Sequence, residues 1–324
     1  MRHPSHPPVA SRQRRELLHR LAGGVVLAAV PGTRAVAAAP PRAGAPVDAV
    51  SSVASAPSPL PPAQRPDWAQ DPVRTYVRVV CDLAGADTWK WFTGRLHAAL
   101  PDGAIVPLLG FDSVIRRKLA AFDPSSATIT FSEATVFRDL ASGEILDEWR
   151  NPLNGRIVRP LHYPEGPNPL TSRAADFVPG GGFSPWVTSA GTARFTRESR
   201  TDSPHPLDPA VWRLESSGPR FRALTLRSYT VALADFADPA RTALPADYSL
   251  TVLSGWFPWM LLGPLPGQML WQAEGRKVDA PEQIPTDLRA RILARFPGLF
   301  ASVVPWKGPM SFMRWHMEQR QPER

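Results

Sequence analysis

Bulky and polar side chains alternate along much of the chain with the two-residue period of β-strands. In residues 88–97 two bulky series alternate, as expected of a pleated strand with both faces partly covered. The same kind of pattern predicts further strands over residues 127–139, 144–149, 156–163, 191–200, 211–216, 221–236, 248–255, 268–273 and 276–278. The pattern therefore predicts a mainly β fold.

Short segments of turn-forming residues separate several of these strands. Residues 141–143, 154–155 and 274–275 lie between strand patterns, and the Asn-Gly pair of the second segment is the strongest hairpin signal. Residues 164–185 are instead dense in Pro, Gly and Asn, which predicts a long irregular loop. Strands joined by tight turns pair antiparallel, so we expect a large twisted antiparallel sheet that forms a barrel or half-barrel.

Apolar residues recur convincingly at helical spacing once, near the C-terminus. Thr286 is placed to cap this helix, Asp287 lies in its first turn, and Pro297 ends it. Its apolar stripe consists of Leu288, Ile292, Leu293 and Phe296. We expect this helix to pack on the sheet, which gives a mainly β, α+β architecture.

The N-terminal segment differs in character from the rest of the chain. Arg14 and Arg15 precede an apolar run over residues 21–30, about half as long as a helix that spans a bilayer. Such a run is typical of a signal-peptide core. We therefore expect the mature protein to be periplasmic or secreted, with no stable membrane span after cleavage.

The segment around the two arginines resembles the twin-arginine export signal, although Gln13, Leu17 and His19 depart from its usual pattern. The resemblance implies the twin-arginine translocase as a partner. Cleavage is expected after Ala37 or Ala39. An ordinary secretory signal, or a basic leader without export value, is the alternative.

Composition divides the chain after the signal peptide, which we place at residues 1–39. Residues 40–67 are mostly Ala, Pro, Ser and Val, and this composition cannot bury enough surface to offset chain entropy. They are predicted to form a disordered linker. The remaining residues, 68–324, suit a single β-rich domain.

The net charge of +8 overstates how basic the mature protein is. Residues 1–39 contain six arginines and one glutamate, so 31 of the 37 basic and 28 of the 29 acidic side chains remain after cleavage. A nearly neutral chain argues against nucleic-acid binding. Cys81 is the single cysteine, so no intramolecular disulfide can form and packing must hold the fold.

Two tryptophan-containing segments, residues 147–155 and 255–263, stand out by composition. With the Gly-x-x-Pro-Gly and Gly-basic-Lys sequences that follow, they resemble the exported bacterial family called domain of unknown function 1838, over roughly residues 76–306. The matching residues are Trp149, Asn151, Pro152, Gly155, Pro258, Trp259, Met260, Gly263, Pro266, Gly267, Gly275 and Lys277, whereas Leu153 and Arg276 depart from the pattern. The resemblance implies an exported single-domain protein and supplies no catalytic residues.

The chain contains 11 tryptophans, more than a core of this size requires. Indole rings offer large rigid surfaces with one donor each, so the surplus predicts an aromatic-lined cavity. The candidate lining residues are Trp89, Trp91, Trp149, Trp256 and Trp259. The alternative is that Trp256 and Trp259 belong to the core.

Polar residues able to face such a cavity lie near these tryptophans. Arg95 and His97 share a strand face with the first two tryptophans. The other polar candidates are Asn151, Arg159, His162 and Lys277. The alternatives are that His97 is a hydrogen-bonded core histidine, that Asn151 shapes its turn, and that Lys277 is solvated.

The chain lacks the short motifs of the standard hydrolases, phosphate-binding loops and zinc proteases. We predict no metal site, because Pro164 prevents His162 and Glu165 from sharing a helix, and the sequence does not identify a cofactor. We therefore expect a protein that binds a small apolar or aromatic ligand in a Trp-lined cavity. The alternatives are an enzyme that acts on a small molecule with a His/Arg cluster in the same cavity, and a structural or interaction module of the cell envelope.

Overall fold

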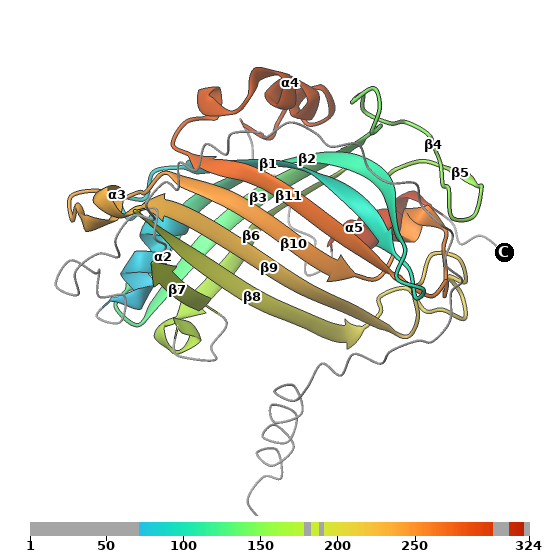
Figure 1. Cartoon of the computed structure of the whole chain (residues 1–324), viewed down its shortest axis with the longest axis horizontal. Coiled ribbons are helices and arrows are strands. Elements are labelled where there is room, and N and C mark those ends of the chain that lie inside the picture. Colours follow the sequence, from blue (N-terminus) through green and yellow to red (C-terminus); the bar gives the residue numbers. More distant parts are fainter. Residues whose placement is uncertain (1–70, 178–182, 188–190, 301–310, 321–324) are drawn as a thin grey trace, which may run out of the picture. The chain divides into compact units, whose positions relative to one another are not determined.

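The computed structural model describes residues 71–177, 183–187, 191–300 and 311–320. The predicted export signal and the predicted linker lie outside the described residues. The described residues are built on one antiparallel sheet of nine strands, in the order β6-β3-β2-β1-β11-β10-β9-β8-β7 (Figure 1). The sheet curls into a half-barrel, which confirms the architecture predicted from the strand patterns.

The strands are long and pair mostly with their neighbours in sequence. Their bounds are β1 Thr88–Ala99, β2 Ile105–Asp123, β3 Ser126–Arg138, β6 Tyr163–Arg173, β7 Phe183–Val187, β8 Thr192–Pro204, β9 Arg220–Ala232, β10 Ala246–Ser254 and β11 Gln268–Val278. The junction with the widest separation in sequence joins β1 to β11, with Trp89 opposite Val278 and Ala99 opposite Gln268. This junction brings the first and the last strand of the sheet side by side in its middle (Figure 1).

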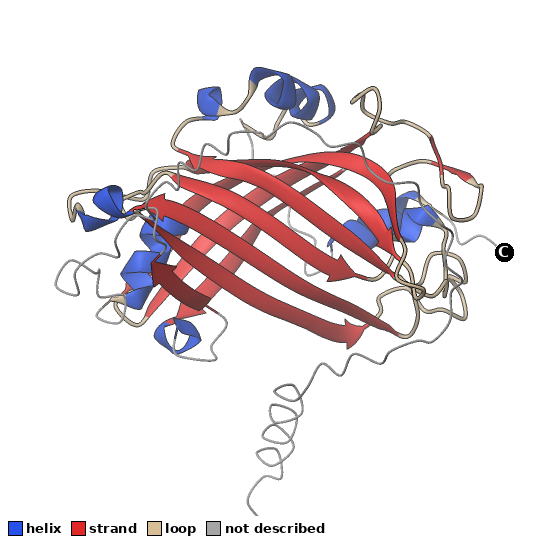
Figure 2. Ribbon diagram, viewed as in Figure 1, coloured by secondary structure: helices blue, strands red, loops and turns tan. Residues whose placement is uncertain are grey.

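Helical segments cover the sheet at its ends and on one face (Figure 2). Their bounds are α2 Pro72–Val80, η2 Ala174–Phe177, α3 Leu233–Ala237, η3 Pro258–Met260, η4 Pro281–Gln283, α4 Thr286–Arg295 and α5 Ser311–Gln319. The predicted C-terminal helix is α4, and it is confirmed. Its expected cap is wrong, because Pro285 holds the N-cap position and Thr286 is the first helical residue. The other helices were not predicted.

The period of two along β1 separates an inner, concave face of the sheet from an outer, convex face. Lys90, Phe92 and Leu96 point to the inner face, where most of the core lies. Trp89 and Trp91 point to the outer face and pack beneath α4 in a second, smaller cluster that includes Leu288, Ile292 and Val114. The bulky residues of β1 therefore serve two different cores.

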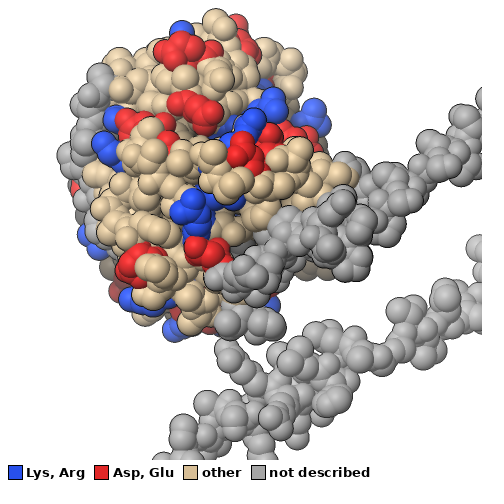
Figure 3. Space-filling model, turned by 90° about the vertical axis from the view of Figure 1, so that its left-hand side faces the viewer, with Lys and Arg blue, Asp and Glu red and all other residues tan. Residues whose placement is uncertain are grey.

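Both ends of the half-barrel interior are closed by packed side chains. At one end α2 inserts Tyr76, which is buried and contacts the ring of Phe177 with 5.3 Å between centroids. At the other end the segment around η3 buries Trp256 and Trp259 completely, and Trp256 Nε1 donates a hydrogen bond to Leu265 O at 2.9 Å. The described acidic and basic side chains at the α2 end are interspersed, without an extended area of one sign (Figure 3).

Two predicted segments are wrong because turn-forming residues lie within strands. Residues 164–185 were expected to form a loop, but β6 occupies most of the first half of this stretch although it contains three prolines. The expected hairpin at residues 274–275 is absent, and β11 runs through it. Gly275 is required there by close approach, since a Cβ atom would lie 1.9 Å from Trp91 O.

Other expectations hold only in part. The pattern did not predict β2, the longest strand. Residues 211–216 form turns and not a strand. Residues 144–149 contribute only an isolated bridge between Ile145 and Arg138, and Trp149, the first residue of a two-residue strand. The Asn-Gly turn does join two strands, but these are the short β4 (Trp149–Arg150) and β5 (Ile157–Val158) of a separate hairpin.

Candidate functional site

A cavity with two adjoining lobes lies on the inner face of the half-barrel. One lobe has a volume of about 330 Å³ and the other about 270 Å³. Five residues line both lobes: Phe92, Glu133, Glu165, Arg227 and Leu250. Together the lobes reach the size of pockets that hold small organic ligands. We call the first the charged lobe and the second the apolar lobe.

The charged lobe collects ionisable side chains from six different strands. It is lined by Lys90 of β1, Arg117 of β2, Glu133 of β3, Glu165 of β6, Arg197 of β8 and Arg227 of β9. The ladder registers put these residues on one face, since Lys90 lies opposite Ile115, and Arg197 lies opposite Arg227. Four basic and two acidic side chains therefore surround one space, and three tyrosines, Tyr76, Tyr229 and Tyr248, complete its wall.

The three arginines are held by hydroxyl and carbonyl groups instead of carboxylates. Arg117 Nη1 donates to Tyr229 Oη at 3.0 Å and to a backbone carbonyl, Arg197 Nη1 donates to Tyr76 Oη at 2.7 Å, and Arg227 Nη1 donates to Ser199 Oγ at 3.2 Å.

Within the described part of the chain, none of these guanidinium groups forms an ion pair. Their positive charge is oriented but has no direct ion-pair partner, although Glu133 and Glu165 line the same lobe, and this arrangement suits the recognition of an anion.

The two glutamates of the lobe lie directly opposite each other on β3 and β6. Glu133 accepts hydrogen bonds from Ser113 Oγ at 3.1 Å and from Thr135 Oγ1 at 3.3 Å. Glu165 accepts one from Asn168 Nδ2 at 3.4 Å. Burial, followed by the charges of both glutamates, raises the pKa of Tyr163 well above its ordinary value, so this tyrosine keeps its proton.

Lys90 is the least satisfied charged group in the cavity wall. Its side chain is 1% exposed, and Nζ has no hydrogen-bond partner among the described residues. Nζ lies over the rings of Tyr248, Phe92 and Tyr229, at 3.5, 5.1 and 5.7 Å from their centroids. Burial, and then the charges of Arg117 and Arg227, lower the pKa of Lys90 well below its ordinary value, while Glu133 opposes the shift.

The magnitudes favour a neutral amine at Lys90. Removing an unpaired ammonium from water costs several kcal/mol, whereas the face of an aromatic ring stabilises a desolvated cation by about 2 kcal/mol. Two neighbouring guanidinium groups add repulsion. The aromatic rings therefore reduce the cost of a charge at this position without removing it.

The apolar lobe extends from the charged lobe toward η3. Its apolar wall is formed by Phe221, Val252, Phe257, Met269 and Trp271. The indole of Trp271 is fixed edge-on between Phe257 and Phe111, with centroid distances of 4.9 and 5.1 Å. It is the one tryptophan of the described residues that lines the cavity. The two lobes together form an amphipathic space, charged at one end and aromatic at the other.

The structure places none of the eleven residues predicted as ligand-binding candidates in the lining of this cavity. Trp89 and Trp91 lie beneath α4, where Trp89 contacts Phe300 with 4.8 Å between ring centroids. Arg95 and His97 are neighbours in an open groove of about 630 Å³ on the outer face. Burial, and then the charge of Arg95, lower the pKa of His97.

The other three predicted tryptophans belong to an aromatic cluster in the core. The rings of Trp149 and Trp259 pack edge-on at 6.0 Å, and Trp259 stacks on Phe257 at 5.6 Å. Trp256 is 2% exposed. This placement matches the alternative in which Trp256 and Trp259 are core residues, and the cluster forms the floor next to the apolar lobe through Phe257.

The remaining polar candidates have local partners. Asn151 accepts from Leu153 N and donates to Met260 O at 2.9 Å, so it shapes its turn and ties it to η3. Arg159 is exposed and pairs with Glu148.

His162 accepts from Phe137 N at 3.0 Å through Nδ1, and its Nε2 lies 2.9 Å from Leu146 O, which fixes the Nε2–H tautomer. Burial is also the main reason that the pKa of His162 is lowered.

Lys277 is not solvated, contrary to the alternative considered for it. It is 2% exposed, and Nζ donates to Arg78 O at 2.8 Å and to Cys81 O. Burial lowers its pKa to about 7. Lys277 is the cross-strand neighbour of Lys90, yet it fastens the end of α2 instead of facing the cavity lining.

Sequence reasoning missed the cavity residues because it chose the other face of β1. The alternation was correct, but Trp89, Trp91, Arg95 and His97 point outward while Lys90 and Phe92 point inward. The signal that could have identified the inner face was Lys90, a lysine between two bulky residues on a strand predicted to have both faces partly covered. Arg117 could not be identified as a cavity residue from the sequence, because its strand was not predicted.

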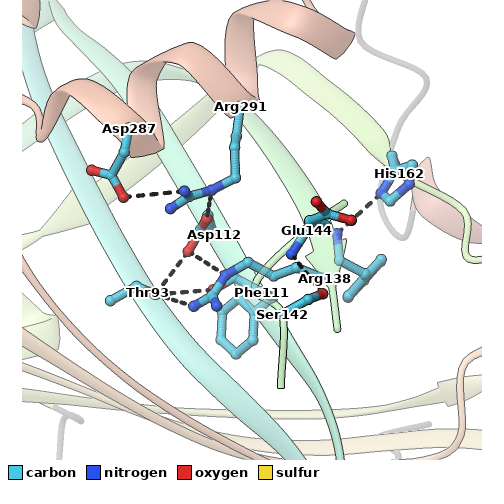
Figure 4. A network of polar contacts seen from close by, with 10 residues as sticks. Thr93, Phe111, Asp112, Arg138, Ser142, Glu144, His162, Asp287 and Arg291 are labelled. Carbon is cyan, nitrogen blue, oxygen red and sulfur yellow. Dashed lines mark hydrogen bonds and ion pairs between the residues drawn. The ribbon is translucent and has the colours of Figure 1, made fainter. Parts of the chain in front are cut away.

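A network of charged and polar side chains around Asp112 lies on the outer face of the sheet (Figure 4). Asp112 is fully buried and forms ion pairs with Arg138 at 2.9 Å and with Arg291 of α4 at 2.7 Å. Thr93 Oγ1 donates to the same carboxylate at 2.7 Å. This network fastens α4 to the sheet and lies on the face opposite the cavity.

Residues 85–305 match the family described as Protein of unknown function (DUF1838). The chain belongs to this family. No curated protein matches the chain. The matched span contains every residue named here in the cavity wall except Tyr76, so the cavity lies within the family's domain.

The described residues include no helix that is long and apolar enough to cross a membrane. They also include no group of three or more His, Cys, Asp or Glu side chains arranged to hold a metal ion.

Proposed function

We propose that the protein binds a small organic anion with an apolar or aromatic body in the inner cavity. The observation that carries the proposal is the set of three inward arginines that have no carboxylate partner, next to a lobe walled by aromatic and aliphatic side chains. Such arginines are matched by a carboxylate or a similar group of the ligand.

The two lobes suggest one orientation for the ligand. Arg227 lines both lobes, so it lies at the boundary between them. In our proposal the anionic group of the ligand binds Arg227 at this boundary, and the apolar part of the ligand extends into the apolar lobe. The body would then lie against Val252, Met269 and Trp271. Apolar area removed from water contributes roughly 25 cal/mol per Å², and the charged end supplies orientation.

Calorimetric titration with 2-naphthoate, and with 2-naphthylmethanol as the uncharged analogue, tests the proposal. We expect Arg227→Gln to weaken naphthoate binding between about tenfold and a hundredfold, because a hydrogen bond to a charged group contributes about 1.5–3 kcal/mol. Binding of the alcohol should change little.

Arg222→Gln is the matched control, since Arg222 lies on the same strand, is exposed and pairs with Asp202. Equal affinities of the acid and the alcohol for the unaltered protein would contradict the proposal.

We also propose that the protein is exported through the twin-arginine route and works in the periplasm or outside the cell. The support is the paired Arg14-Arg15 before a short apolar run, and the resemblance of this segment to that signal. Ligand binding would then take place outside the cytoplasm.

A further inference from the structure

We infer that Lys90 is a reactive amine that forms an imine with the carbonyl group of its ligand, so that the cavity takes 2-oxo acids with an apolar or aromatic substituent. The inference rests on the proposed function and names its ligand class. It concerns one side chain that no structural role in the described residues accounts for.

The first support is the position of the amine. Lys90 lines the charged lobe, is 1% exposed, and has no hydrogen-bond partner among the described residues. The rings of Phe92, Tyr229 and Tyr248 surround Nζ and restrict its movement. A ligand that enters the lobe therefore meets an amine that is already desolvated and held in place.

The contrast with Lys277 shows that burial alone does not explain Lys90. The two lysines are cross-strand partners and almost equally buried. Lys277 donates to two backbone carbonyls that end α2, which is a structural task. Lys90 has no such task, and a long cationic side chain is costly to bury without one.

The protonation state suits a nucleophile. An amine attacks a carbonyl only through its lone pair, and lysines are activated by desolvation or by a neighbouring cation. Both conditions hold for Lys90, since burial and the charges of Arg117 and Arg227 lower its pKa. The same two arginines would hold the carboxylate of a 2-oxo acid and thereby place its carbonyl carbon beside the amine.

The chemistry needs no further reactant. The Nζ lone pair forms a bond to the carbonyl carbon, and a proton moves from nitrogen to oxygen to give a carbinolamine. Loss of water then leaves the carbon–nitrogen double bond of the imine, with no change in oxidation state. Glu133 lines the same lobe, acts electrostatically on Lys90, and is placed to relay these protons.

Reductive trapping tests the inference directly. The full chain is incubated with 2-oxo-4-phenylbutanoate and cyanoborohydride, which converts an imine into a stable secondary amine. We expect one adduct per chain in the intact mass, located at Lys90 by peptide mapping, and no adduct in Lys90→Met. Lys118→Met is the matched control, because Lys118 is exposed on β2, and it should keep the adduct at Lys90.

Peptide mapping of the unaltered protein locates the adduct even if Lys90→Met does not fold. An adduct spread over exposed lysines, or one that persists unchanged in folded Lys90→Met, overturns the inference.

A second ligand separates this inference from the proposed function. The corresponding 2-hydroxy acid has the same carboxylate and body but no carbonyl, so it binds without reacting. Calorimetric binding of the hydroxy acid without a Lys90 adduct from the oxo acid overturns the imine and leaves the proposed function standing. Absence of both binding and adduct overturns both.

Discussion

At the scale of single residues, two neighbouring lysines differ in their hydrogen bonds. Lys90 and Lys277 lie opposite each other on β1 and β11, and both are buried. Lys277 Nζ donates to Arg78 O and Cys81 O, whereas Lys90 Nζ has no partner among the residues described. One lysine therefore holds α2, while the other faces the space that α2 helps to close.

The lowered pKa of Lys277 predicts how stability depends on pH. Its folded-state pKa, about 7, lies below that of the unfolded chain, so between these values the unfolded state binds more protons and the free energy of unfolding rises with pH. The slope has an upper limit of about 1.4 kcal/mol per pH unit. Urea denaturation from pH 7 to about 8.5 should show the rise, and Lys277→Met should reduce the slope by up to this amount.

Other groups set the limits of this measurement. The lowered pKa values of His97, His162, His205 and His316 add to the rise close to pH 7, and they do so equally in the unaltered protein and in Lys277→Met. Lys90 contributes a slope of the same sign, so some rise should remain in Lys277→Met. Burial raises the pKa of Cys81, which acts in the opposite direction at higher pH, and this is why the range ends near the ordinary pKa of a thiol. An unchanged slope in Lys277→Met would show that this lysine stays protonated.

At the scale of elements, α4 is attached to the outer face by one buried carboxylate as well as by apolar contacts. Asp112 is fully buried, while the side chains of Arg138 and Arg291 are 20% and 27% exposed. Leu288 and Ile292 supply the apolar part of the contact. Polar and apolar contacts from α4 therefore meet on the same stretch of β2.

The mutation Asp112→Asn keeps the shape of this side chain and removes its charge. We expect a loss of about 3 kcal/mol in the free energy of unfolding, because two partly buried guanidinium groups lose their counter-charge. Denaturant unfolding followed by tryptophan fluorescence measures the loss. Asp287→Asn is the control, since its side chain is 72% exposed, and it should change stability by less than about 0.5 kcal/mol. Equal losses in the two variants would contradict this account.

Element prediction succeeded where local pattern decides structure and failed where tertiary contacts override it. The alternation of β1 and the apolar stripe of α4 are local, and both elements were predicted. Gly275 indicated a turn by composition, but the close approach of Trp91 O requires glycine within a strand. The choice of the inner face failed for a similar reason, because both faces of β1 are covered and bulk alone does not distinguish them.

At the scale of the whole molecule, the half-barrel leaves space between its walls that side chains fill only in part. The indoles of Trp149, Trp256 and Trp259 pack in the core, as bulky rings usually do, yet a cavity remains, and ionisable side chains from six strands line it. The sequence predicted an internal cavity from its aromatic residues. In the structure, arginine, lysine and tyrosine side chains also line the cavity. No local sequence pattern indicates that these side chains meet.

Export is a property of the entire chain and has its own test. Replacing both Arg14 and Arg15 with lysine keeps the charge and removes the paired arginines that the twin-arginine pathway recognises. We expect the precursor to accumulate in the cytoplasm, as measured by cell fractionation. The unaltered protein should appear outside the cytoplasm with an N-terminus after Ala37 or Ala39 by mass spectrometry. Undiminished export of the double variant would favour the ordinary secretory route.

The prolines of β6 have a consequence for the open rim of the half-barrel. This strand lies at one end of the sheet, and its outer edge pairs with no other strand among the described residues. Pro164, Pro167 and Pro169 have no N–H group, so three of the eleven positions of β6 lack the donor of a ladder hydrogen bond. The β6 end of this unclosed sheet is therefore an incomplete template for a strand of a second copy, which disfavours edge-to-edge association at that end.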